Sequence, residues 1–399
     1  MAFREFRYKV ELKYIHESKE EDITTEGIKF ICIDSDYLGK KAFPVVYLGL
    51  NLDKKIYNKM IRNIQKDTVV FSLSKYNVSD DGSSNSVESK VIKDEFIYFF
   101  NETNSTDSDD TTDKEAIEMV SIKIGLISLD ILNMCKNVKN DVLVGNMSSI
   151  LYDYLDNKAE KVIIEPLDNN KEFEELIIPP VPTLNKLLEY LNNTCSFYNT
   201  QYRFFIDLNK TVYLLSSKGK AIETKDSKYS SIIVRVSADS SNVDKYKEAG
   251  VEIDTSNKCY NLYLDESNTS TTINVYKDKE VNKIITISTN GVINKSTLDN
   301  SDNAKGTRTS IYRTFNENEY EIKNIKNLIE SNKVMMNITK EGVDCSMITP
   351  EKSISVENHE LYKKFNGKYL LAGKQEIYMM NDSDSFTCNT TLKLLRIKS

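Results

Sequence analysis

The hydrophobic positions in the first third of the chain follow two different periods. Residues 3–14, 28–34 and 43–50 alternate between apolar and polar side chains, which predicts three β-strands. From Leu52 the apolar residues recur every fourth position, which predicts an amphipathic helix. The stripe consists of Leu52, Ile56, Met60 and Ile64, and the basic residues beside it are Lys55, Lys59, Arg62 and Lys66. Val69, Phe71 and Leu73 then restore the alternating pattern of a strand.

The middle third changes to a helical pattern. A strand expected over 120–128 leads into helices around 129–136 and 146–156, followed by a polar loop over 168–175. Pro179, Pro180 and Pro182 predict an extended entry to the next element. Thr183 is an N-cap candidate for a helix whose apolar face is Leu184, Leu187, Leu188 and Leu191. Alternating residues over 202–214, with a polar turn at 207–210, predict a hairpin.

The last third is again rich in strands, from about residue 228 onward. One further helix is expected over 318–330, where Asn318 and Glu321 have the spacing of a capping box. Near the C-terminus the pattern predicts a run of hairpins, with Asn366-Gly367 as a type I′ turn.

A weak internal repeat relates the first and last thirds. Residues 45–74 align without gaps to residues 310–339, and both read strand, cap, helix, strand. Tyr47 falls on Tyr312, and Asp53 falls on Asn318. The alignment needs no gap although the hydrophobic period changes from that of a strand to that of a helix and back. This favours two structurally similar units in two separate domains.

Charge is concentrated in one segment. Of 60 acidic and 53 basic residues in the 399-residue chain, residues 101–118 hold seven acidic residues and one lysine. The remainder is close to neutral, so there is no electrostatic case for nucleic-acid binding. The segment also has part of the spacing of a calcium loop, in Asp107, Asp109, Thr111, Asp113 and Glu118. Thr112 replaces the glycine that such a loop needs for its sharp turn, which favours a solvated acidic loop.

The sequence offers little for catalysis, cofactor binding or metal binding. It contains two histidines, His16 and His359, which we interpret as surface residues, and no recognised nucleophile, phosphate-loop or zinc-protease motif. The six cysteines are scattered and are expected to be reduced. They are Cys32, Cys135, Cys195, Cys259, Cys345 and Cys388. We expect no enzymatic activity, no cofactor, no metal, no signal peptide and no membrane anchor, and folding in the cytoplasm.

Two stretches resemble a known family. Residues 177–219 contain a proline-rich strand, a leucine-rich helix and an aromatic hairpin ending in Leu-Leu-Ser. Residues 334–380 form a β-rich region near the C-terminus. Both are similar to the baseplate hub proteins of contractile phage tails and R-type bacteriocins. The resemblance implies an α+β, mainly β chain with two tail-tube-like β-barrel domains joined by an α/β domain. Many Gram-positive relatives carry an additional lytic domain, which we do not recognise in this chain.

The resemblance also implies domain boundaries and partners. We expect a tube-like domain over 1–118, an α/β domain over 119–225, a second tube-like domain over 226–345 and a hairpin region over 346–399. Three copies would form a homotrimer that adapts a hexameric tail tube to a trimeric central spike within the baseplate. The expected partners are the tail-tube or distal tube protein, the spike and other baseplate proteins, in a particle assembled in the bacterial cytoplasm.

Two other classes of function remain open from the sequence. A tail-associated peptidoglycan hydrolase would need a carboxylate pair, which 60 acidic residues cannot exclude, although the chain has no Trp for sugar stacking. A receptor-binding fibre or adhesin would show long β repeats or heptads and Gly-rich turns, and the chain has only 13 Gly.

Overall fold

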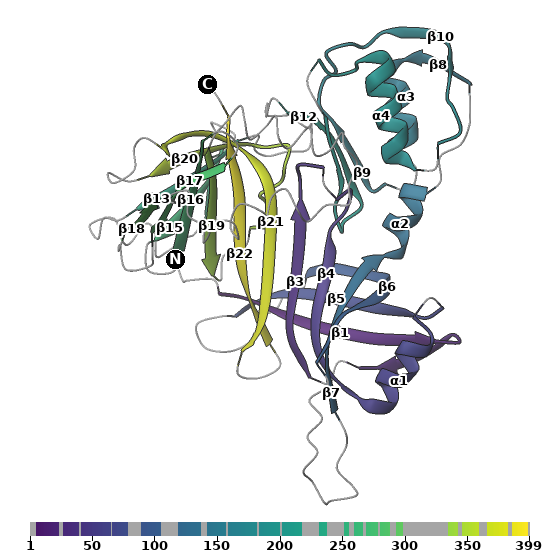
Figure 1. Ribbon diagram of the computed structural model, residues 1–399, viewed down its shortest axis with the longest axis vertical. Coiled ribbons are helices and arrows are strands. Elements are labelled where there is room, and N and C mark those ends of the chain that lie inside the picture. The colour runs from purple at the N-terminus through teal and green to yellow at the C-terminus, as the bar shows by residue number, and fades with distance from the viewer. Residues whose placement is uncertain are drawn as a thin grey trace, which may run out of the picture.

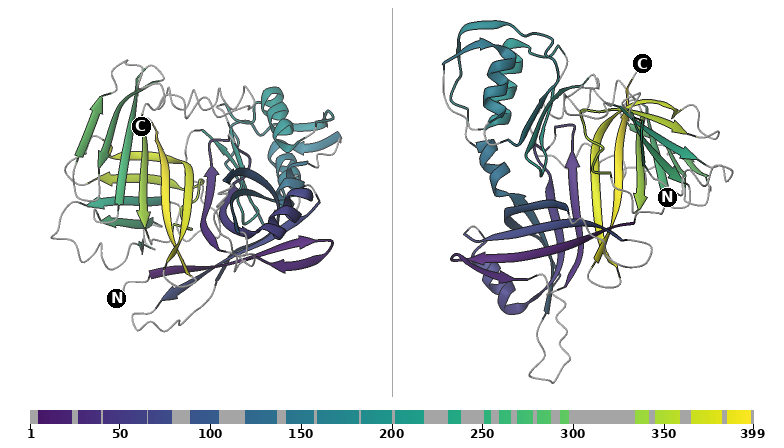
Figure 2. Two further views of the ribbon diagram at one scale, coloured as in Figure 1. Left: turned by 60° about the horizontal axis from the view of Figure 1, so that its bottom comes forward. Right: turned by 180° about the vertical axis from the view of Figure 1, so that it is seen from behind.

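The protein is described by a computed structural model, in which three hydrophobic cores are linked through shared strands (Figures 1 and 2). The described residues are 5–23, 27–39, 41–64, 66–78, 89–104, 119–136, 142–156, 159–181, 183–199, 202–217, 231–237, 251–254, 259–265, 269–277, 280–287, 293–297, 334–341, 345–358, 365–381 and 385–397. These residues are mainly β-strand, as the sequence predicts.

Eight strands form a closed circuit of hydrogen-bonded neighbours around the first core. In circuit order they are β1 (Glu5–His16), β5 (Thr68–Val78), β6 (Ser89–Asn104), β7 (Met119–Ser128), β4 (Val45–Asp53), β3 (Ile28–Asp36), β21 (Gly367–Asn381) and β22 (Ser385–Arg396). The pair Tyr8–Phe386 closes the circuit between β1 and β22. The short strand β2 (Lys19–Asp22) pairs with the end of β1. We call these strands, with α1, the first unit.

Helix α1 (Lys54–Arg62) covers this unit at one end (Figure 1). The side chain of Asp53 accepts a hydrogen bond from the backbone nitrogen of Lys55 at 2.6 Å, which satisfies one of the free amides of the first turn. Ile56 and Met60 are buried, as the apolar stripe predicts. Leu52 belongs to the end of β4 instead, because its backbone pairs with Val120 of β7.

The middle unit combines helices with two small sheets. It contains α2 (Leu129–Lys136), β8 (Val142–Asn146), α3 (Met147–Leu155), β9 (Lys161–Ile164), β10 (Glu172–Ile177), α4 (Leu184–Cys195), β11 (Tyr202–Ile206) and β12 (Thr211–Ser216). The predicted helices are confirmed, and the hydroxyl of Thr183 caps α4. The predicted hairpin is also confirmed, as β11 and β12. The loop expected over 168–175 is wrong in part, because residues 172–177 pair with β8 as strand β10.

A three-stranded sheet, ordered β11-β12-β9, lies between two cores. Phe205, Tyr213 and Leu215 face a core to which strands β21 and β22 also contribute. Phe204, Val212 and Leu214 face the helical core on the other side. Because side chains alternate across a strand, a sheet buried on both faces reads as a continuous apolar run, as β11 and β12 do. β9 pairs with β12 in the parallel direction.

Among the described residues, the second unit is an open sheet ordered β14-β15-β13-β20-β21-β22-β19-β16-β17-β18. Its remaining strands are β13 (Ser231–Ser237), β14 (Val251–Asp254), β15 (Cys259–Asp265), β16 (Thr269–Lys277), β17 (Glu280–Ile287), β18 (Ile293–Thr297), β19 (Val334–Glu341) and β20 (Ser353–Asn358). Strand β13 runs parallel to both of its neighbours.

The C-terminal hairpin β21–β22 belongs to both β units. Tyr369 and Leu394 are part of the core of the second unit, whereas Tyr378 and Phe386 are part of the first core. In both views of Figure 2 the yellow hairpin lies between the purple and the green strands. All 17 strands of the two units therefore form one continuous hydrogen-bonded network.

Several sequence predictions are corrected by this arrangement. Strand β7 pairs with β4 and β6, so the first unit extends beyond the expected boundary at residue 118. The four-domain division otherwise stays a prediction. Asn366-Gly367 is not a two-residue turn: Gly367 has a positive φ of 145° but begins β21, where it pairs with Val356. Residues 357–366 lie between these paired positions.

The predicted repeat is tested only in part. Its first copy is the expected strand–helix–strand unit β4–α1–β5, and β19 falls on the last strand of the second copy. The helix expected over 318–330 lies outside the described residues. The two copies are expected in two separate domains, but β3 and β19 both pair with the C-terminal hairpin. Both copies therefore belong to one shared sheet, and the aligned pattern is no evidence of two separate domains.

Candidate functional site

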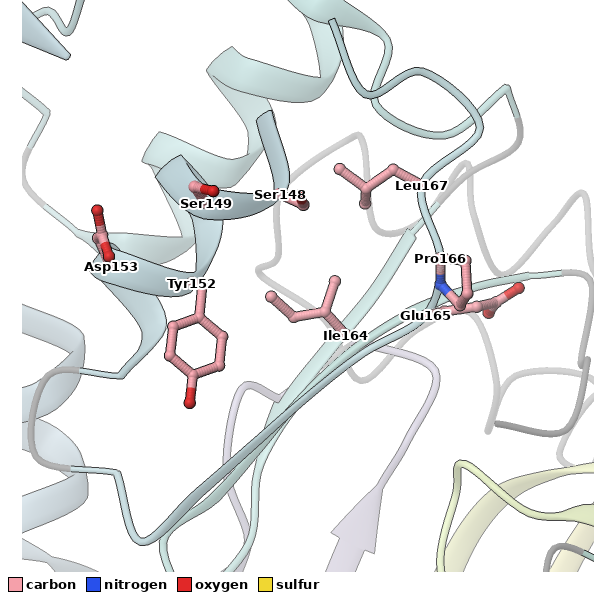
Figure 3. Close-up of a pocket in the computed structure, with 8 residues that line it drawn as sticks. All are labelled: Ser148, Ser149, Tyr152, Asp153, Ile164, Glu165, Pro166 and Leu167. Atoms are coloured by element: carbon pink, nitrogen blue, oxygen red, sulfur yellow. The ribbon is translucent and has the colours of Figure 1, made fainter. Parts of the chain in front are cut away.

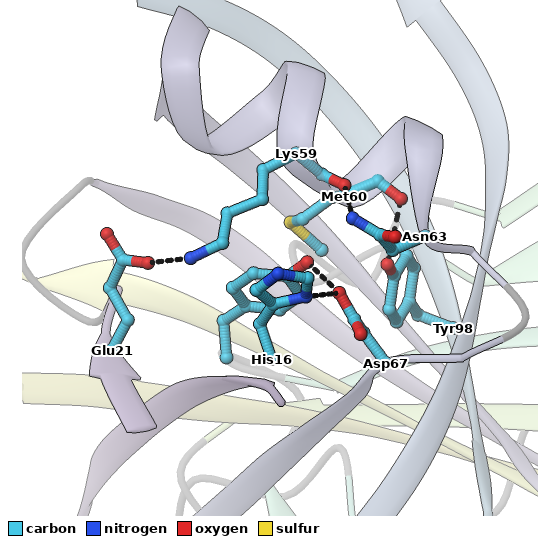
Figure 4. A network of polar contacts seen from close by, with 8 residues as sticks. His16, Glu21, Lys59, Met60, Asn63, Asp67 and Tyr98 are labelled. Carbon is cyan, nitrogen blue, oxygen red and sulfur yellow. Dashed lines mark hydrogen bonds and ion pairs between the residues drawn. The ribbon is translucent and has the colours of Figure 1, made fainter. Parts of the chain in front are cut away.

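A polar network lies where α1 meets the ends of β1 and β5 (Figure 4). The Tyr14 hydroxyl donates to Oδ2 of Asp67, and Nδ1 of His16 lies 2.7 Å from the same oxygen. The Asp67 side chain is almost fully buried, and that of His16 is three-quarters buried. The Tyr98 hydroxyl donates to the backbone oxygen of Met60 at 2.8 Å. The interpretation of His16 as a surface residue is therefore wrong, because its ring is held against a buried carboxylate.

The network is suited to holding the helix in place. Burial and the hydrogen bond to Asp67 raise the pKa of Tyr14 far above its usual range, and burial raises the pKa of Tyr98 to about 12. Both phenols are therefore neutral donors at physiological pH. An Asp–His pair could serve as the base of a catalytic triad. In the described part of the chain, however, the side-chain hydrogen bonds of His16 are confined to Asp67.

One member of the basic helix face belongs to the same network. Nζ of Lys59 forms an ion pair with Glu21 at 3.0 Å and lies 5.3 Å from the centre of the Tyr14 ring. Lys55, Arg62 and Lys66 are exposed. Lys59 thus forms contacts within the chain, whereas Lys55 and Arg62 on α1, and Lys66 beyond its end, are solvated as the sequence favours.

The remaining chemical candidates from the sequence are not brought together. His359 and the calcium-like residues Asp107, Asp109, Thr111, Asp113 and Glu118 lie outside the described residues. Cys32, Cys135, Cys195, Cys345 and Cys388 are free thiols. Burial raises the pKa of Cys388 and so opposes formation of a reactive thiolate. Within the described ranges, no group of three or more His, Cys, Asp or Glu residues has the geometry of a metal site.

A pocket of about 400 Å³ lies between α3 and the end of β9 (Figure 3). Tyr152 and Ile164 point into it, and Leu167 and Ser148 lie at its border. The amides at the start of α3 are already occupied, because Ser148 donates to Asn170 and Ser149 donates to Asn146. The pocket therefore lacks free helix amides to hold an anion.

A second polar cluster links the middle unit to the C-terminal hairpin. Nε of Arg203 donates to the backbone oxygen of Ser216 at 3.0 Å. Ser216 in turn donates to Glu165 from its backbone nitrogen at 2.7 Å and from its hydroxyl at 2.6 Å. Nη1 of Arg203 reaches the backbone oxygen of Leu371 on β21 at 3.5 Å. Burial lowers the pKa of Arg203 to about 10, and the Glu165 carboxylate opposes this effect, so the guanidinium stays charged at neutral pH.

Backbone hydrogen bonds secure the same junction. The segment after β3 contacts both neighbours: Ile206 donates to Ala42 at 2.7 Å, and Tyr37 donates to Ala372 at 2.9 Å. Tyr37 and Phe205 also pack edge to face, with ring centroids 4.7 Å apart. The helical core and the core of the second unit thus meet at β11. Sequence reasoning missed Arg203 and Glu165, although a charged residue inside the apolar run 202–206 is a signal of a buried polar cluster.

A comparison with known families identifies the family of the chain. The family model described as bacteriophage PBS1 gene 109 protein matches residues 3–397. The chain belongs to this phage protein family. This membership bears out the resemblance to a phage-tail family. A search of curated proteins found no match.

Solved structures of similar fold include a tail protein from Neisseria meningitidis MC58. It is 12% identical, with 97% of this chain and 96% of that chain covered and a TM-score of 0.44. The 43 kDa tail protein of prophage MuSo2 from Shewanella oneidensis is 11% identical, with 98% of each chain covered and a TM-score of 0.47. A component of the type VI secretion system of E. coli is 7% identical, with 94% and 75% covered and a TM-score of 0.42.

Among the described residues, no helix is long and apolar enough to cross a membrane.

Proposed function

We propose that the chain is a structural baseplate hub of a contractile phage-type tail, which adapts the tail tube to the central spike. The single observation that carries the proposal is the C-terminal hairpin β21–β22, whose strands pack into the cores of both β units. An adapter between two assemblies must hold its binding surfaces at fixed positions. Shared strands achieve this, because neither unit can rotate without breaking backbone hydrogen bonds.

Membership of a phage protein family and the resemblance of residues 177–219 and 334–380 to hub proteins support the same assignment. In this proposal the closed circuit of the first unit and the open sheet of the second correspond to two tail-tube-like domains, and the middle unit joins them. Three copies then contribute six tube-like units to match a hexameric tube, and their threefold symmetry matches a trimeric spike. The particle is assembled in the bacterial cytoplasm.

We further propose that the hub has no catalytic activity of its own. The described polar clusters support this role, because His16, Asp67, Arg203 and Glu165 are each engaged in contacts that hold one element against another. Lysis of peptidoglycan would then be the task of another chain. A zymogram in which the pure protein clears peptidoglycan, with loss of clearing in a single carboxylate variant, would establish the hydrolase alternative instead.

The proposal is tested by light scattering on the pure protein, alone and with the spike protein of the same particle. We expect a homotrimer in at least one of the two conditions. A monomer in both conditions would overturn the hub assignment, and binding of the pure protein to host cells would favour the fibre alternative.

A further inference from the structure

The middle unit exposes three large apolar side chains on one face of its two-stranded sheet. Val144 is 72% exposed, Ile177 is 68% exposed and Val142 is 59% exposed. These are the highest values among the large hydrophobic residues of the described chain. Single exposed apolar residues are ordinary, but three on one small sheet form an apolar surface that is stabilised when another molecule covers it.

The strand register explains why these residues share one face. Ile177 of β10 lies directly opposite Val142 of β8, and Leu176 lies opposite Leu143. Leu143 and Leu176 point to the other face, where they pack against the helical core. Because side chains alternate along a strand, Val142, Val144 and Ile177 must point away from that core. We call these three residues the β8 patch. Figure 1 shows the sheet at the end of the middle unit remote from the first unit.

Negative charge borders the patch. The register of β10 shifts between Phe173 and Leu176, so Glu174 and Glu175 together lie opposite Val144. Both glutamates and the neighbouring Glu172 are exposed. A second copy of this chain would bring identical carboxylates close together, which disfavours self-association through this face. A partner with basic side chains next to apolar ones matches the arrangement of charges.

The two edges of the small sheet differ in their protection. Strand β10 carries a bulge and three glutamates, which are devices that prevent further strand pairing. Strand β8 has the sequence Val-Leu-Val-Gly-Asn, without a charge, a proline or a bulge. In the described part of the chain it pairs with β10 alone. The free edge of β8 is therefore the side at which another strand can be added.

We propose that the β8 patch is a docking site for an extended segment of another protein, in which apolar residues alternate with lysine or arginine. The segment pairs with the free edge of β8, its apolar side chains lie beside Val142 and Val144, and its positive charge is attracted by the exposed glutamates of β10. This inference does not depend on the hub assignment, because it concerns only the chemistry of the segment that binds.

Two labelled ten-residue peptides test the proposal on the full-length protein by fluorescence anisotropy. One alternates valine with lysine, and the other alternates valine with glutamate. We expect the lysine peptide to bind at least ten-fold more tightly than the glutamate peptide, and its binding to weaken as salt is added. The substitution Val144→Ser should weaken binding of the lysine peptide at least ten-fold. The matched control Ile61→Ser removes an apolar residue that is 43% exposed on α1, and should leave binding unchanged.

Hydrogen exchange locates the bound peptide. We expect the lysine peptide to slow exchange of the backbone amides of residues 142–146. The proposal is overturned if neither peptide binds, if both bind equally, if Val144→Ser binds as the unaltered protein does, or if residues 142–146 are not protected. The melting temperature of Val144→Ser serves as a check that the variant is folded.

Discussion

Tyr378, on the C-terminal hairpin, packs edge to face against Tyr8 on the first strand. Their ring centroids are 4.9 Å apart, the ring planes meet at 79°, and both side chains are buried. The first unit therefore completes its core with residues from the opposite end of the chain. Contacts of such long sequence separation close a large loop, which makes folding of this unit depend on the last strands being present.

The first prediction concerns this ring pair. Tyr378→Ala should lower the free energy of unfolding by about 3–5 kcal/mol, because it removes a buried aromatic side chain and leaves a cavity. Tyr378→Phe keeps the ring and should lower it by no more than about 1.5 kcal/mol. Urea titration followed by tyrosine fluorescence measures both values. Equal effects of the two substitutions would show that the ring contact does not stabilise the first unit.

A second prediction concerns Gly125, which lies opposite Phe99 between β7 and β6. A Cβ atom at Gly125 would lie 2.2 Å from the Phe99 ring, so the ring must move away. Gly125→Ala should therefore destabilise the protein by about 1–3 kcal/mol. In a Phe99→Ala background the same substitution should be neutral, because the ring is absent. The double-mutant cycle is measured by urea titration, and additive effects would refute the steric explanation.

The third prediction concerns alkaline pH. Burial raises the pKa of Tyr98 and that of Tyr369 to about 12. Because the unfolded chain ionises its tyrosines near pH 10, the unfolded state binds fewer protons than the folded state between pH 10 and 12. Stability should be retained below pH 10 and fall as the pH rises through this window, by up to about 1.4 kcal/mol per pH unit for each such tyrosine.

Absorbance of the tyrosinate ion measures this transition directly, since the chain has no Trp. Tyr98→Phe should reduce the slope of stability against pH above pH 10. A slope in the variant equal to that of the unaltered protein would contradict the assigned role of Tyr98.

The fourth prediction concerns the network at α1. Asp67→Ala leaves the Tyr14 hydroxyl and the His16 ring without their acceptor, and should lower the free energy of unfolding by about 1–3 kcal/mol. Asp67→Asn keeps one oxygen acceptor and should lower the free energy of unfolding by a smaller amount. Thermal unfolding of the two variants at neutral pH makes the comparison. If Asp67→Asn destabilises the protein as much as Asp67→Ala does, the hydrogen bonds that Asp67 accepts are not the source of its stabilising effect.

Local features of the fold were predictable from the sequence. The cap at Thr183 is predicted because a short polar side chain before an apolar helical pattern satisfies free amides of the first turn. The hairpin β11–β12 was found because alternation on either side of the polar turn at 207–210 is visible within a few residues.

Long-range features could not be read from local patterns. Residues 172–177 have a charged sequence that indicates a loop, and only pairing with β8 makes them a strand. The parallel pairing of β9 with β12 and the insertion of Tyr378 into the first core depend on segments far apart in the chain. His16 was misread because its buried partner, Asp67, lies on another element.

The number of copies in an assembled tail tests the central proposal most directly. Quantitative mass spectrometry of purified tails, with isotope-labelled peptides of this chain and of the tube protein as standards, gives copies per particle. The hub assignment predicts three copies of the chain in each tail. Absence of the chain from purified tails, or six or more copies in each tail, would contradict it.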